Sequence, residues 1–183
     1  LRMLGLEPVI ASIGAIGEPE KPLEAEAGRR GIDIHPFRMR PGPNYPGARR
    51  ILHFARQRGI DVLHLHGYKG NILFGFLPRR LLELPRVTTL HGWTNTGRFN
   101  RMWFYEALDA VSLRFMDAVV LVNDRMREHP RIRGRHALRL RVIPNGIPAE
   151  PQSGTDVEER VAHFCSGKPV IGTIGRLSPE KGH

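Results

Sequence analysis

The stretch AVVLVN, residues 118–123, decides the fold of this 183-residue chain. It is a continuous apolar strand, and strands of this kind fit a parallel sheet that is covered on both faces. Outward from it, the patterning predicts further strands in residues 9–14, 32–37, 61–66, 86–91 and 140–146.

Helical segments are expected between these strands, in residues 23–30, 48–58, 71–82, 100–116 and 124–129. The helix over 71–82 is expected to be capped near Asn71, and residues 41–47 are expected to form a loop. The helix over 100–116 is expected to bury an apolar side that includes Trp103, Phe104, Leu108, Val111 and Phe115. Strands that alternate with helices predict an α/β fold with a doubly wound, Rossmann-like parallel sheet.

The composition is that of a globular protein, with 40% hydrophobic and 25% charged residues. A single cysteine, Cys165, excludes an internal disulfide framework and a zinc site of several cysteines, and it fits a reducing compartment. No apolar run approaches the roughly 20 residues of a membrane helix, and the first residues lack the apolar core of a signal peptide. The sequence therefore predicts a cytoplasmic location.

The net charge is +10, and residues 1–150 carry the whole excess. A basic domain suits polyanions such as nucleic acid, phosphosugars or an anionic membrane surface. The alternative is a coding bias toward arginine, since most of the basic residues are arginines. Nucleic acid is not expected as a partner, because the chain lacks a clustered basic and aromatic stripe and any recognised nucleic-acid motif.

Three domain segments are predicted. Residues 1–147 form the α/β domain, and residues 148–168 form a linker with a short polar helix around 156–163. Residues 169–183 begin a second domain with one strand, 170–174, and the loop that follows it. One strand cannot bury itself, so this second domain is expected to be incomplete in the chain.

Three predicted strands end in a polar residue followed by glycine: His66-Gly67, His91-Gly92 and Asn145-Gly146. Ligands of open α/β sheets bind outside the carboxyl ends of the strands, so His66 and His91 are expected to face one crevice. The alternative is that each histidine simply packs at a strand end. His64 and His66 share one face of a strand, but a third metal ligand at useful spacing is missing, so no metal site is expected.

The segment GRLSPEKG, residues 175–182, follows a predicted buried strand directly. Gly175 opens the backbone, while Arg176 and Lys181 place two positive charges at the carboxyl end of the strand. Arginine grips phosphate with paired donors and lysine adds a compact charge, so the two could neutralise a diphosphate. The alternative is a solvated charged loop. No Walker or dinucleotide-binding glycine pattern is present.

Four motifs in this order and spacing resemble the retaining GT-B glycosyltransferases of family 4, over essentially the whole chain. They are HLHGYKGN (64–71), TTLHGWT (88–94), VIPNGI (142–147) and IGTIGRLSPEKG (171–182). The resemblance implies that residues 1–147 are the N-terminal, acceptor-side domain of a GT-B fold. It implies transfer of a sugar from a nucleotide-diphosphate sugar to a glycan or lipid-linked acceptor, without a cofactor or bound metal.

The resemblance also implies roles for individual residues. His91 would be the catalytic residue beside the transferred sugar, and Arg176, Lys181 and Gly175 would hold the donor diphosphate. The acceptor side and the cleft would be formed by His66, Gly67, Tyr68, Gly92, Trp93, Thr94 and Asn145.

The sequence departs from the family pattern in several places. The first strand with its glycine-rich loop would precede Leu1, the paired glutamates that engage the donor would follow His183, and Asn123 stands where serine is common. The alternative function is therefore a catalytically inactive GT-B module, truncated at both ends, that acts at most as a binding domain. A peripheral contact with the inner face of the membrane, through residues 72–80 or 101–114, is an additional expectation.

Overall fold

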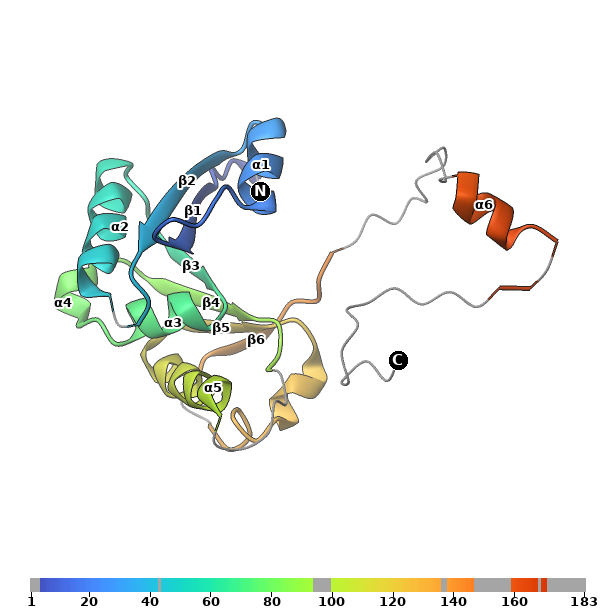
Figure 1. Ribbon diagram of the computed structural model, residues 1–183. Helices are drawn as coiled ribbons and strands as arrows, with labels where there is room; N and C mark the ends of the chain where they lie inside the picture. The colour runs from blue at the N-terminus through green and yellow to red at the C-terminus, as the bar shows by residue number, and fades with distance from the viewer. Residues whose placement is uncertain are drawn as a thin grey trace. The chain divides into compact units, whose positions relative to one another are not determined.

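The computed structural model describes residues 4–42, 44–93, 100–135, 138–146, 159–167 and 169–170. The chain divides into two compact units, Leu1–Pro144 and Asn145–His183 (Figure 1). In the described part of the second unit, the helix is α6 (Glu159–Cys165). The strand expected over 170–174 falls outside the described residues from position 171 onward. The three domain segments expected from the sequence stay predictions.

The first unit contains two parallel sheets. In the first sheet, β1 (Val9–Ala15) pairs with β2 (Asp33–Met39). The second sheet has the order β3-β4-β5-β6 and is parallel throughout. Its strands are β3 (Leu63–His66), β4 (Arg86–Leu90), β5 (Ala118–Leu121) and β6 (Leu140–Val142).

These parallel sheets and their helices confirm the α/β, Rossmann-like fold class. The structure has two sheets where one was expected. Among the described strands, β1 pairs with β2 and β3 pairs with β4, but no hydrogen-bonded pair joins β1 to β3.

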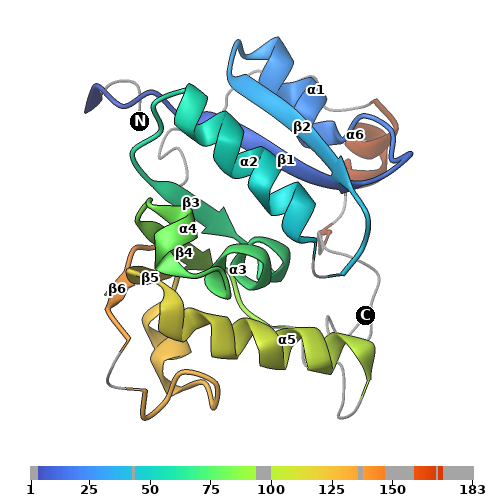
Figure 2. The ribbon, with the colours of Figure 1, turned by 90° about the vertical axis from the view of Figure 1, so that its left-hand side faces the viewer.

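Helices cover the first sheet on both faces. The first is α1 (Pro22–Arg29), where Glu24 accepts bonds of 2.8 and 2.7 Å from the guanidinium of Arg38 on β2. On the opposite face lies α2 (Tyr45–Gln57), whose Phe54 ring meets Phe37 edge-on at 5.5 Å. Figure 2 shows α2 on the same side of the strands as the helices of the second sheet.

The start of α2 corrects the expected loop over residues 41–47. The helix begins at Tyr45, because the side-chain oxygen of Asn44 accepts a 2.8 Å hydrogen bond from the N–H of Gly47. A proline in the first turn has the φ angle of a helix and needs no hydrogen-bond acceptor there, so Pro46 supports this early start.

The single helix expected over residues 71–82 is also wrong. The structure has α3 (Tyr68–Gly75) and a separate short α4 (Arg79–Leu82). Pro78 cannot donate the hydrogen bond that a continuous helix would need. The buried guanidinium of Arg86 donates from Nη1 to the carbonyls of Phe74, Gly75 and Leu77, at 2.8, 3.1 and 3.1 Å. The end of α3 is thus satisfied by a side chain of β4.

The last long helix turns a different face inward from the one expected. It is α5 (Arg101–Ser112), followed by the 3₁₀ turn η2 (Leu113–Phe115). Phe104, Val111 and Phe115 are 57%, 40% and 46% exposed. The residues buried on α5 are instead Glu106, Asp109, Ala110 and Ser112. The two acidic side chains can face inward because residues of other segments donate hydrogen bonds to them.

A common core holds the second sheet against α2, α3 and α5. Leu65, Leu90, Val119 and Leu121 point from the sheet into this core, where Phe74 of α3 is almost fully buried. Beyond β5, the chain forms the short 3₁₀ helix η3 (Asp124–Glu128), where a short helix was expected over 124–129. Among the described helices, none has the length and apolar character needed to cross a bilayer.

Candidate functional site

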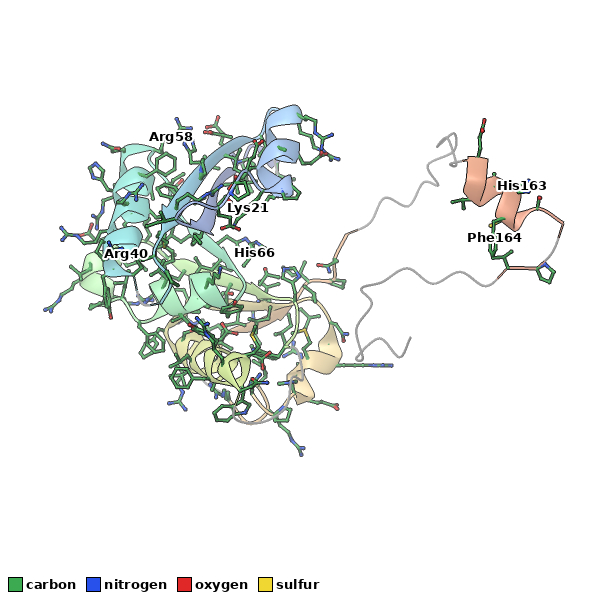
Figure 3. All side chains as sticks on the ribbon, viewed as in Figure 1. Lys21, Arg40, Arg58, His66, His163 and Phe164 are labelled. Carbon is green, nitrogen blue, oxygen red and sulfur yellow. The ribbon has the colours of Figure 1, made fainter. Side chains whose placement is uncertain are left out.

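The structure brings His66 and His91 together at the carboxyl ends of two neighbouring strands. His66 is the last residue of β3 (Figure 3). His91 directly follows β4. Nδ1 of His66 lies 3.2 Å from Nε2 of His91, and the two rings are stacked with their centroids 5.5 Å apart. Parallel pairing of β3 with β4 places these two strand ends side by side. The expected convergence of the two histidines is therefore confirmed.

His64 joins these two residues on the same face of the sheet. Its ring centroid lies 4.5 Å from that of His66, while its Nε2 lies 2.8 Å from the hydroxyl oxygen of Thr89 on β4. The hydroxyl of Thr89 therefore engages one of the two ring nitrogens of His64. In the part of the chain that the structure describes, no group of three or more His, Cys, Asp or Glu residues is arranged to hold a metal ion.

Two members of the histidine cluster, His64 and His66, favour the neutral ring. Partial removal from water lowers the pKa of His64 below its ordinary value of 6.5, and the neighbouring His91 lowers it further. The pKa of His66 is also lowered, first by desolvation and then by His64 and His91. A neutral imidazole can donate from one nitrogen and accept at the other, so the pair is suited to hydrogen-bonding hydroxyl groups at neutral pH.

The loop after His91 is anchored by Trp93. Gly92 has a φ of +120°, a conformation that side chains other than hydrogen rarely allow. The indole Nε1–H of Trp93 donates a 3.0 Å hydrogen bond to Asp109 on α5. Its ring stacks on His129 at 4.5 Å, and the guanidinium of Arg131 lies over it at 5.8 Å. The backbone that carries His91 is thereby tied to α5 and to the segment after η3.

Asp109 is the centre of a buried polar network that sequence reasoning missed. Its second oxygen accepts a 2.7 Å hydrogen bond from the Asn71 amide, and the Asn71 carbonyl oxygen accepts one of 2.7 Å from the hydroxyl of Thr88. Burial raises the pKa of Asp109, while the bonds from Asn71 and Trp93 oppose that rise. The signal in the sequence is an aspartate among apolar positions of an expected helix, but its partners come from distant segments.

Gly67 and Tyr68 form the start of α3 beside His66. Gly67 is the N-cap of this helix and has a φ of +78°. The ring of Tyr68 lies 5.7 Å from that of Tyr105 on α5, and the guanidinium of Arg101 lies 5.7 Å from the Tyr105 ring. The helix end that faces the carboxyl edge of the sheet carries the positive end of the α3 dipole.

The structure does not test the placement of the other expected site residues. Thr94 lies outside the described residues, as do Gly175, Arg176 and Lys181. Asn145 is exposed and begins the second unit.

A parallel α/β domain with polar side chains at the carboxyl ends of its strands belongs to the Rossmann-like class of ligand-binding domains. The family model described as Glycosyltransferase Family 4 matches residues 1–151, and the chain belongs to this family. No curated protein is similar enough to the chain to count as a match.

Proposed function

We propose that the chain is the acceptor-side part of a retaining GT-B glycosyltransferase, which moves a sugar from a nucleotide-diphosphate sugar to a glycan or lipid-linked acceptor. The membership in glycosyltransferase family 4 supports a transferase function. The observation that carries the proposal is the contact between His66 and His91, 3.2 Å apart at the carboxyl edge of the sheet. Imidazole nitrogens at this exposed edge can orient sugar hydroxyls by hydrogen bonds.

In the proposed reaction, His91 acts on the sugar side of the donor. Arg176 and Lys181, with Gly175 between strand and loop, hold the leaving diphosphate. Breaking the bond between the sugar and the diphosphate builds negative charge on the diphosphate, and fixed cations stabilise that charge. Positively charged side chains fill the role that a bound metal has in other transferases, so the reaction is expected to need none. A cytoplasmic site for this transfer is part of the proposal.

Arg176→Ala and Lys181→Ala test this assignment in a chain extended to include a complete donor-side domain. Each change removes a charge-assisted contact worth about 1.5–3 kcal/mol, so turnover should fall roughly ten- to a hundred-fold. His91→Ala should also reduce turnover but leave the affinity for free nucleoside diphosphate nearly unchanged, because that ligand lacks the sugar. Steady-state kinetics and calorimetric titration measure both effects. If both charge deletions leave turnover within about twofold, the 175–182 loop is a solvated turn and the assignment fails.

The alternative function is a module that binds without turnover. The protein that includes the donor-side domain separates the two, using a panel of nucleotide-diphosphate sugars and a sensitive assay for released nucleoside diphosphate. Robust turnover would exclude the binding module, whereas acceptor binding alone would support it.

A second role, contact with a membrane surface, is favoured by the exposed apolar side of α5. Phe104, Val111 and Phe115 follow one another at helical spacing and are 57%, 40% and 46% exposed, with Arg101 and Arg114 on the same segment. Apolar residues flanked by arginines suit the interface of an anionic bilayer.

Replacing Phe104 and Phe115 together by serine should reduce co-sedimentation with phosphatidylglycerol vesicles at least tenfold. Each buried aromatic side chain contributes roughly 1.5–3 kcal/mol to transfer out of water, which supports an effect of this size. Leu23→Ser and Tyr45→Ser, at exposed positions on α1 and α2, are the control. Equal binding of all three proteins would leave α5 as an ordinary solvent-facing helix.

A further inference from the structure

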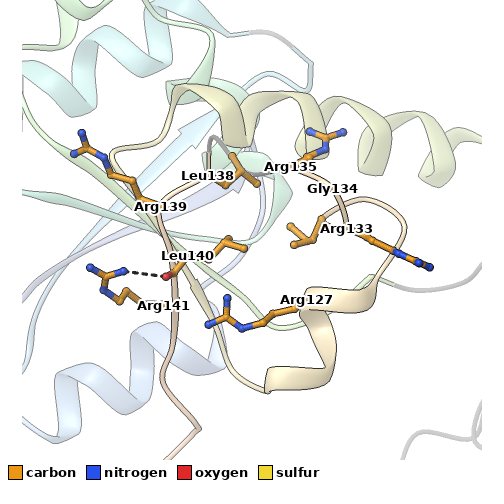
Figure 4. A pocket seen from close by; sticks show the side chains of 9 residues that line it. Arg127, Arg133, Gly134, Arg135, Leu138, Arg139, Leu140 and Arg141 are labelled. Carbon is orange, nitrogen blue, oxygen red and sulfur yellow. Dashed lines mark hydrogen bonds between the residues drawn. The ribbon is translucent and has the colours of Figure 1, made fainter.

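A cavity of about 680 Å³ in the first unit is lined mainly by arginines (Figure 4). Its apolar wall consists of Ile132, which is almost fully buried, and of the half-buried Leu138 and Leu140. The remaining lining residues are Arg127, Arg133, Gly134, Arg135, Arg139 and Arg141. We call this feature the arginine cavity. None of its lining residues belongs to the His66–His91 site.

The positive charge of the arginine cavity is poorly compensated by the protein. Among the described arginines that line the cavity, Arg127 has a carboxylate partner: its Nε donates a 2.8 Å hydrogen bond to Asp124. For Arg135, Arg139 and Arg141, the described part of the chain offers no carboxylate within ion-pair distance. Arg133 has none either, but Figure 4 shows Arg133 and Arg135 pointing away from Arg127, Arg139 and Arg141. Like charges gathered around one cavity repel one another unless an anion lies between them.

Backbone contacts hold two of these side chains in place. Nη1 of Arg135 donates to the carbonyl of Ala110 on α5 at 2.5 Å, and Nη1 of Arg141 donates to the carbonyl of Leu140 at 3.1 Å. Burial and the nearby Arg114 lower the pKa of Arg135 below its ordinary value. Arg139 and Arg141 are two residues apart along the extended chain at β6, so they extend from the same face of the strand.

We propose that the arginine cavity binds the phosphoryl groups of an anionic ligand, with a diphosphate as the simplest match. Each guanidinium carries five N–H donors in a planar fork, and the backbone contacts of Arg135 and Arg141 use one N–H each. The guanidinium groups of Arg139 and Arg141, which have no carboxylate partner among the described residues, match the multiple charges of a diphosphate, whereas a single carboxylate would leave most of their donors unused. The buried Ile132, with Leu138 and Leu140, forms an apolar wall on one side of these donors.

This site is additional to the proposed transfer reaction, whose diphosphate is assigned to Arg176 and Lys181. A soluble diphosphate and the phosphate of a lipid headgroup share the chemistry that the cavity recognises. Nucleic acid is the less favoured ligand, because the basic residues surround a cavity of limited volume instead of forming a stripe along the surface.

The test is calorimetric titration of the full 183-residue chain with inorganic pyrophosphate at low salt. The combined variant Arg139→Gln and Arg141→Gln should bind pyrophosphate at least tenfold more weakly, since each lost charge-assisted contact costs roughly tenfold. Both side chains are exposed, and Arg139→Gln alone should give an intermediate loss. Arg49→Gln with Arg80→Gln removes the same total charge from exposed sites on α2 and α4 and should change the affinity less than twofold.

Co-sedimentation of the same proteins with phosphatidylglycerol and phosphatidylcholine vesicles identifies the source of the phosphoryl group. If only phosphatidylglycerol vesicles bind, and the cavity variant alone loses that binding, the ligand is a headgroup phosphate and the proposal stands. If wild type binds neither pyrophosphate nor vesicles, or if both double variants lose binding equally, the proposal is wrong. Binding of duplex DNA that depends on Arg139 and Arg141, without pyrophosphate or vesicle binding, would also overturn it.

Discussion

Replacing Arg86 by alanine should lower the free energy of unfolding by about 2–4 kcal/mol. Arg86 is 2% exposed, and its Nη1 is the donor for the carbonyls of Phe74, Gly75 and Leu77 at the end of α3. A buried carbonyl left without a donor costs about 1–3 kcal/mol. The carbonyls of Gly75 and Leu77 would lose the Arg86 donor, whereas that of Phe74 keeps the 3.3 Å bond from the N–H of Leu77. Part of this loss is offset, because burial lowers the pKa of Arg86 and the charge is costly to keep.

Urea denaturation followed by circular dichroism measures this change. Arg80→Ala is the matched control, since Arg80 is exposed on α4 and should shift the free energy of unfolding by less than about 0.5 kcal/mol. Arg86→Lys should recover only part of the stability, because an ammonium lacks the planar, five-donor geometry of guanidinium. A loss below about 1 kcal/mol in Arg86→Ala would mean that water or a neighbouring donor satisfies these carbonyls.

The second large effect is expected for Asn71→Ala, again about 2–4 kcal/mol of unfolding free energy. Asn71 is fully buried and bridges Thr88 on β4 to Asp109 on α5 through bonds of 2.7 Å each. Among the described residues, its removal leaves the indole of Trp93 as the remaining side-chain donor to the carboxyl of Asp109. Orphaned buried polar groups and the space left by the side chain both destabilise the fold.

This loss should depend on pH. The Asn71 bond lowers the pKa of Asp109, so without it the pKa of this carboxyl rises further above its ordinary value of 3.8. A carboxyl whose folded pKa is raised favours the folded state at low pH and opposes it as the pH rises through that pKa. The deficit of Asn71→Ala should therefore be larger at pH 7 than at pH 4. Asn123→Ala, an exposed cap of η3, should show a loss of about 1 kcal/mol and no such trend.

The sequence predicted the strands well because their signals are local. Val119 and Leu121 belong to an uninterrupted apolar run, and Gly67 and Gly92 mark strand ends where φ is +78° and +120°. The meeting of His66 and His91 followed from the same signals, since neighbouring parallel strands end at one edge. Pro78 was also a local signal, and it explains why the expected helix over 71–82 is interrupted.

The inward face of α5 could not be predicted in the same way. Apolar spacing favoured burial of Phe104 and Phe115, but the structure exposes both and buries Glu106 and Asp109. Burying a carboxylate is tolerated only when partners meet it. Those partners are far away in the sequence: Asn71 and Trp93 for Asp109, and Arg131 for Glu106 at 2.6 Å. No local pattern shows that such partners will arrive.

The parallel register of the strands has a consequence for folding kinetics. Every pair of bonded strands joins residues more than 20 positions apart, as Leu65 with Thr88 and Thr88 with Val119 show. The chain loses the conformational entropy of a whole crossover connection before the first hydrogen bond between two parallel strands can form. Topologies with such nonlocal contacts fold slowly. During that interval the apolar strands remain open to other chains. The yield of native protein therefore depends on the rate of folding relative to the rate of aggregation. Because aggregation slows as the protein concentration falls, refolding should succeed best at high dilution.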